Sequence, residues 1–170
     1  MLFALLTRLS VDLALWLSFA AAFAIGISGF LKHRILRVLD AGSTAIFGFL
    51  ALFCGFVEPG LQVSAIRLII DISLFGIALA SIIAREPFTL QYARGEVDPA
   101  ILAGSPFIRA NYLITLVWMI AFAIMAAADG AATFVPAIPV TGAVAAGLMA
   151  LAAALAFTWR YPRRVQSTMR

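Results

Sequence analysis

Apolar residues gather into five long blocks along this chain, and polar residues collect between them. Each block is about 20 residues long and holds few charges, which is the length that an α-helix needs to cross the hydrocarbon core of a bilayer. The predicted spans are residues 11–31, 41–57, 65–84, 110–128 and 137–159. The pattern therefore predicts an all-α integral membrane bundle, one transmembrane domain over residues 1–170, with a polar loop between its third and fourth helices.

The composition agrees with this prediction and excludes several kinds of site. Hydrophobic residues make up 64% of the chain and charged residues only 12%, against about 25% charged in ordinary soluble domains. Cys54 is the only cysteine and His33 the only histidine, which excludes an internal disulfide, a cysteine-rich zinc site and a haem held by two histidines of one chain. We expect no cofactor and no metal.

The net charge of +4 comes from 12 basic and 8 acidic residues, and most basic residues flank apolar blocks. That placement indicates membrane orientation and not nucleic-acid binding. With five spans, one side of the membrane receives ten basic residues: Lys32, Arg34, Arg37, Arg85, Arg94, Arg109, Arg160, Arg163, Arg164 and Arg170. The other side keeps Arg8 and Arg67. We therefore predict an external N-terminus and a cytoplasmic C-terminus.

The start of the chain also resembles a signal peptide. Its apolar run, Val11 to Leu31, is long enough to span a bilayer and is followed by the basic sequence K-H-R. A signal peptide has a shorter apolar region. We therefore interpret this run as the first transmembrane helix.

The segment from Arg85 to Arg109 is the only long polar stretch between apolar blocks, and we place it in the cytoplasm. Pro87 can begin a short helix in which Phe88 and Tyr92, four residues apart, share a face. One interpretation is an interfacial helix with its rings at headgroup depth. The other is a recognition surface for a partner or headgroup. Its candidate residues are Phe88, Thr89, Gln91, Tyr92, Arg94 and Asn111.

Two start signals follow in the same segment. Asp98-Pro99 with Gly104 predicts a single capped helical turn, with Asp as N-cap and Gly at its end. Ser105-Pro106 repeats the start signal and is expected to begin the fourth span.

Two runs within this region have a distinctive sequence: P-F-T-L-Q-Y-A-R, from Pro87 to Arg94, and S-P-F-I-R-A-N-Y, from Ser105 to Tyr112. Together with the acidic-proline turn between them and Trp118 in the next span, they resemble a group of small multi-pass bacterial membrane proteins. Some of these are labelled similar to intracellular septation protein A. The resemblance implies the bacterial inner membrane and a role in the envelope or in division, and it supplies no catalytic residues.

Arg67 and Asp71 are the charged residues expected within the third span. They lie four residues apart, so they share a helix face and can pair. Asp71 is expected roughly 5 Å from the bilayer midplane, where a charge costs on the order of 2.5–3.5 kcal/mol. Two interpretations remain open: a structural ion pair, with Asp12 nearby, or a proton, ion or ligand site.

Small residues recur at helical spacing on several spans. Ser18, Ala22 and Gly26 form such a stripe on the first span, and Gly48, Ala51 and Gly55 form one on the second. The last span is rich in alanine. Such faces let helices approach closely, so the expected partners are the lipid bilayer, other membrane helices or a second copy of the chain.

No catalytic motif is present: the chain has no P-loop, no H-E-x-x-H and no G-x-S-x-G. We predict no enzymatic activity and name no catalytic residue. The sequence favours a scaffold or partner-binding subunit that uses residues 85–109. The alternative is a small transporter or channel subunit that uses Arg67 and Asp71.

Overall fold

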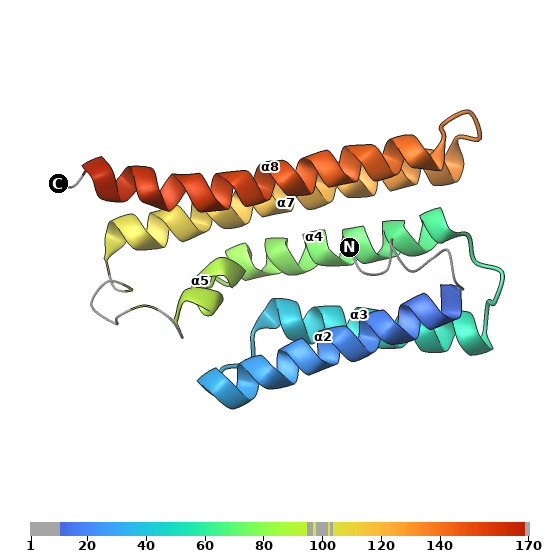
Figure 1. Ribbon diagram of the computed structural model, residues 1–170, viewed down its shortest axis with the longest axis horizontal. Helices are drawn as coiled ribbons and strands as arrows, with labels where there is room; N and C mark the ends of the chain where they lie inside the picture. The colour runs from blue at the N-terminus through green and yellow to red at the C-terminus, as the bar shows by residue number, and fades with distance from the viewer. Residues whose placement is uncertain (1–10, 95–96, 98–101, 103, 169–170) are drawn as a thin grey trace.

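The computed structural model describes residues 11–94, 97, 102 and 104–168, and all the regular structure in these residues is helical (Figure 1). The long helices are α2 (Val11–His33), α3 (Val38–Phe56), α4 (Val63–Ile83), α7 (Ser105–Phe134) and α8 (Val140–Thr168), and α5 (Phe88–Ala93) is short. Within the described residues, five helices are long and apolar enough to cross a membrane. The predicted all-α, multi-pass class is confirmed.

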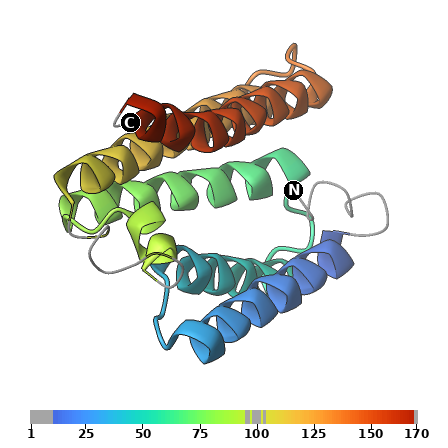
Figure 2. The same cartoon turned by 60° about the vertical axis from the view of Figure 1, so that its left-hand side comes forward.

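The long helices run back and forth between two ends of the bundle (Figures 1 and 2). α2 packs on α3, α3 on α4, α4 on α7 and α7 on α8, so neighbours in the chain are neighbours in space. The short helix α5 contacts α3, α4 and α7 at the end where α4 finishes and α7 begins. We call this the α5 end. The last turns of α2 and α8 lie at the same end (Figure 1).

The predicted small-residue faces bring α2 and α3 together. Ser18 is buried, and a Cβ added at Gly26 would lie 3.6 Å from Cβ of Asp40 in α3. A Cβ added at Gly48 would lie 3.0 Å from the Phe19 ring of α2. Gly55 was predicted on the same face of α3, but a Cβ added there would have no neighbouring atom within 4 Å. The close approach therefore lies along the middle and the α5 end of this pair.

The alanine-rich helix α8 packs along α7 in the predicted way. Ala143 and Ala154 are buried, and a Cβ added at Gly147 would lie 3.5 Å from Cγ of Met125. Trp118 Nε1 also donates a hydrogen bond to Thr158 Oγ1 across this pair, at 3.1 Å. The indole thus packs its apolar body between helices while its N–H keeps a partner.

Helix α7 is longer than the sequence indicated. It begins at Ser105 with Pro106 in its first turn, as the start signal predicted. The sequence predicted that the fourth span ends at residue 128, but the helix continues to Phe134. Gly130 packs against α4: a Cβ added there would lie 3.6 Å from Leu68 Cδ1, an ordinary contact distance. Asp129 thereby lies inside a helix and faces α4. The turn predicted at Asp98-Pro99 lies outside the described residues.

Candidate functional site

Three charged residues meet between α4 and α7, near the end of the bundle opposite α5. Arg67 Nη2 lies 2.9 Å from Asp129 Oδ1. Asp71 lies one helical turn further along α4, close enough to Asp129 for the two carboxyls to interact electrostatically. Asp71 is 3% exposed and Asp129 is 1% exposed. We call Arg67, Asp71 and Asp129 the charged cluster.

This geometry corrects the predicted pairing of Arg67 with Asp71. Both residues do lie on the face of α4 that points into the bundle, but the ion pair of Arg67 is with Asp129. Because α7 continues as a helix past residue 128, the Asp129 carboxylate lies beside the Arg67 guanidinium. Asp129 was missed from the sequence because the predicted fourth span ends one residue before it. The available signal was the apolar sequence that continues for several residues after Gly130.

The cluster has one more acid than base. Asp71 Oδ2 is buried and has no hydrogen-bond donor among the described residues, and the donor nearest to Asp129 Oδ1 is the Arg67 guanidinium at 2.9 Å. Two facing carboxylates repel each other strongly where water is excluded. One proton shared between the two acids would leave one carboxylate to balance the Arg67 guanidinium.

The cluster lies some distance inside the bundle. At a rise of 1.5 Å per residue, Asp71 is about 12 Å from the first residue of α4. Arg67 is closer to that end, and its side chain keeps 13% exposure. The guanidinium thus lies between the buried acids and the end of the bundle opposite α5.

An apolar region separates the charged cluster from the polar residues at the α5 end. Ala78 of α4 and Phe122 of α7 are both buried here, and Leu74 and Trp118 pack against them. Ser81, one turn beyond Ala78, is the next buried polar residue along α4. The contact between α4 and α7 is therefore polar at both ends and apolar in the middle.

Helix α5 is bound to three of its neighbours by hydrogen bonds. Gln91 Oε1 accepts a hydrogen bond of 2.9 Å from the backbone N–H of Val38, in the first turn of α3. This bond satisfies one of the N–H groups that a helix start leaves unpaired. Thr89 Oγ1 lies 2.8 Å from Thr115 Oγ1 in α7. The Phe88 N–H donates to Ser81 Oγ of α4 at 3.2 Å.

Tyr92 attaches α5 to the start of α3 by a second route. Its hydroxyl donates a hydrogen bond to Asp40 Oδ1, and the Arg37 guanidinium lies over the ring, 4.4 Å from its centroid. The ring also meets Phe88 edge-on at 6.5 Å. Arg37 and Asp40 were missed by sequence reasoning because their link to Tyr92 spans more than 50 positions of the chain.

The predicted recognition residues thus point mostly into the protein. Phe88, Gln91 and Asn111 are buried. The backbone carbonyl of Asn111 accepts a hydrogen bond from Thr89 at 2.9 Å. Arg94 remains exposed and pairs with Glu86 at 2.8 Å. The short helix was predicted correctly, but most of its polar groups bind the bundle.

Burial raises the pKa of the Tyr92 phenol, and the hydrogen bond to Asp40 and the charge of that carboxyl raise it further. The positive charge of Arg37 acts in the opposite direction and lowers this pKa. The folded protein therefore favours the protonated phenol. The resulting stabilisation is complete below about pH 10, the usual tyrosine value, and is lost as the pH rises above it.

We expect Tyr92→Phe to lower stability at neutral pH by about 1 kcal/mol, the net contribution of one hydrogen bond. We also expect it to reduce the alkaline loss of stability. Thermal unfolding in detergent, measured on both sides of about pH 10, checks both effects. Tyr161→Phe is the matched control, because no described residue forms a hydrogen bond with that hydroxyl. Equal alkaline loss in the wild type and Tyr92→Phe would contradict the assignment.

The described residues contain no group of three or more His, Cys, Asp or Glu side chains that could hold a metal ion. Comparison of the chain with protein-family models, curated proteins and solved structures gives no match.

Proposed function

We propose that this multi-pass membrane protein is a small transporter or channel subunit that carries protons, with the charged cluster as its proton-binding site. The observation that supports this most directly is the second buried acid. A structural ion pair needs one carboxylate for one guanidinium, whereas Arg67 faces a buried pair of carboxyls. Ionisable groups inside membrane helices mark ion or proton pathways when their charges do not simply cancel.

The layout of the α4–α7 contact supports a gated site. Arg67 provides the polar route from one end of the bundle to Asp71 and Asp129. The apolar contact of Ala78 with Phe122 closes the route toward the α5 end. Apolar constrictions of this kind exclude water until the helices separate. Proton passage would then require a small movement of α7 relative to α4.

The proposed orientation places the N-terminus outside and the α5 end in the cytoplasm of a bacterial inner membrane. Support comes from the ten basic residues assigned to one side of the five-span chain. The charged cluster would then open toward the external side. The similarity of residues 85–118 to the small bacterial membrane proteins named above is part of the same proposal.

Proton flux into liposomes tests the function. The full-length protein is reconstituted with a pH-sensitive dye inside the liposomes, and a potassium diffusion potential drives protons inward. We expect the wild type to acidify the interior and Asp71→Asn to return the rate to that of empty liposomes, because asparagine cannot take up the transferred proton. Asp12→Asn is the matched control, since Asp12 is an exposed acid at the same end of the bundle. Unchanged flux in Asp71→Asn would reject the proposal.

A scaffold or partner-binding role of residues 85–109 is the second candidate. The observation that favours it is the firm attachment of α5, which would present Arg94 and Glu86 in a fixed arrangement. A preordered segment loses less conformational entropy on binding. Under this candidate, Arg94→Ala would remove co-purifying partners while Asp71→Asn would not.

A further inference from the structure

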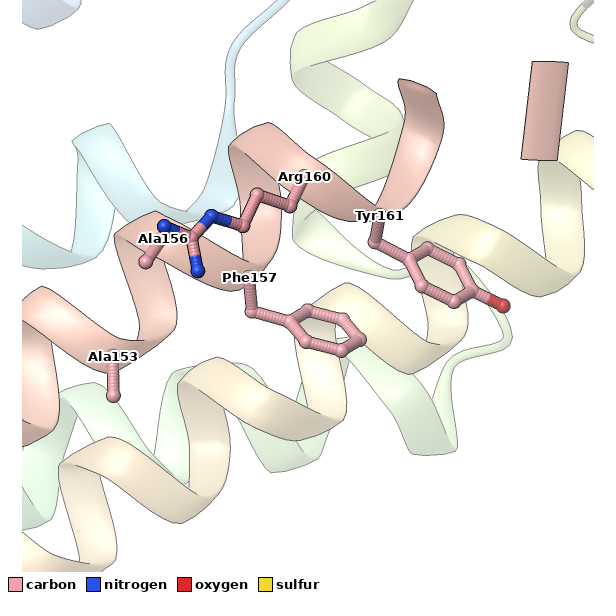
Figure 3. Close-up of a pocket in the computed structure, with 5 residues that line it drawn as sticks. All are labelled: Ala153, Ala156, Phe157, Arg160 and Tyr161. Carbon is pink, nitrogen blue, oxygen red and sulfur yellow. The ribbon is translucent and has the colours of Figure 1, made fainter. Parts of the chain in front are cut away.

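A hollow lies on the outer face of α8, close to the α5 end. Its volume is about 290 Å³, and it is lined by Ala153, Ala156, Phe157, Arg160 and Tyr161 (Figure 3). These positions recur at spacings of three and four, so they form one stripe along the helix. The hollow is separate from the charged cluster, which lies between α4 and α7.

The lining combines a cation with an apolar floor. The Arg160 side chain runs back along α8, so that its guanidinium lies beside Ala156 (Figure 3). The small side chains of Ala153 and Ala156 form the floor of the hollow. Phe157 and Tyr161 stack with ring centroids 5.0 Å apart and form a rigid wall beside it. A ligand that fits this surface carries an anionic group and an adjoining hydrocarbon chain.

Arg160 has no acidic partner among the described residues, and it is exposed. A guanidinium facing a membrane interior is costly unless an anion or water compensates its charge. Its planar donor groups match the oxygens of a phosphate in a bidentate arrangement. The neighbouring Trp159 is 71% exposed, as expected for an aromatic residue at headgroup depth.

We propose that the α8 hollow binds an anionic phospholipid, with its phosphate on Arg160 and one acyl chain along Ala153 and Ala156. Charge complementarity selects this occupant. Basic residues flank several helices at the α5 end, among them Arg37, Arg85 and Arg109, and Arg160 adds an exposed positive charge on α8. Such clusters favour anionic lipids by electrostatic attraction. The hollow adds a defined position for one lipid molecule.

Native mass spectrometry of the full-length protein in detergent tests the proposal. Dioleoyl-phosphatidylglycerol and dioleoyl-phosphatidylcholine are titrated separately, so that only the headgroup differs. We expect tighter binding of phosphatidylglycerol to the wild type. Arg160→Gln should weaken this binding about tenfold and abolish the preference, through loss of a charged hydrogen-bond donor. Ala156→Leu, which fills the floor of the hollow, should weaken binding of both lipids severalfold.

Arg94→Gln is the matched control, because it removes the same charge from an exposed position at the α5 end. It should leave the lipid preference in place. Equal losses in Arg94→Gln and Arg160→Gln would overturn the proposal in favour of diffuse electrostatic attraction. A wild type without headgroup preference would also overturn it. So would an Ala156→Leu protein that loses a dimer but binds lipid normally, since the occupant would then be a second copy of the chain.

Discussion

Arg67→Gln is expected to destabilise the protein by about 3–5 kcal/mol, the usual effect of removing one partner of a buried ion pair. The substitution leaves two buried carboxyls, Asp71 and Asp129, without a counter-charge. Thermal and denaturant unfolding in detergent measure the loss. Arg94→Gln, which breaks an exposed ion pair, should cost no more than about 1 kcal/mol.

Double-mutant cycles identify the direct partner of Arg67. The coupling energy of Arg67 with Asp129 should fall in the range of about 0.5–3 kcal/mol observed for residues in contact. The coupling of Arg67 with Asp71 should be smaller, because the guanidinium contacts Asp129. Asn replaces each acid so that shape and hydrogen-bonding capacity are retained. A larger coupling with Asp71 would restore the pairing predicted from the sequence alone.

Phe122→Ala should have an effect of comparable size on stability and a second effect on proton flux. Phe122 is 4% exposed and packs with Ala78 between the charged cluster and the α5 end. Truncating a buried phenylalanine typically costs about 3–5 kcal/mol. It also opens space in the apolar contact, so we expect faster inward proton flux in the liposome assay. Phe134→Ala is the control on the same helix, since Phe134 is 77% exposed.

The two effects of Phe122→Ala can be separated. Phe122→Leu refills much of the space and should recover most of the stability and most of the proton barrier. If Phe122→Ala lowers stability while proton flux stays at the wild-type rate, Phe122 is a packing residue only. The proposed route along α4 and α7 would then be wrong, although the charged cluster could still bind a proton.

The apolar blocks by themselves determined the class of this protein. A run of about 20 apolar residues can satisfy its backbone hydrogen bonds in lipid only as a helix, so local composition is sufficient to predict a span. The start of α7 at Ser105-Pro106 and the short helix after Pro87 were predictable for a similar reason. Helix starts depend on a few adjacent residues and need no distant partner.

The small-residue faces were also readable from the sequence. Helical spacing places Ser18 and Gly26 on one side of α2, and that side does meet α3. The shared face of Arg67 and Asp71 on α4 followed from the same spacing argument, and Asp71 is buried there. Periodicity determines which side of a helix is least compatible with lipid. It does not determine which helix covers that side.

Partners that are distant in sequence were decided by the tertiary structure. Arg67 and Asp71 are four residues apart and were the obvious pair, yet the packing of α7 on α4 places Asp129 at the guanidinium. The same packing keeps α7 helical through Gly130, where isolated Asp-Gly favours a turn. Gln91 likewise binds the start of α3, 53 residues earlier in the chain. Such contacts depend on how helices are arranged in space, and short-range sequence patterns carry no information about that arrangement.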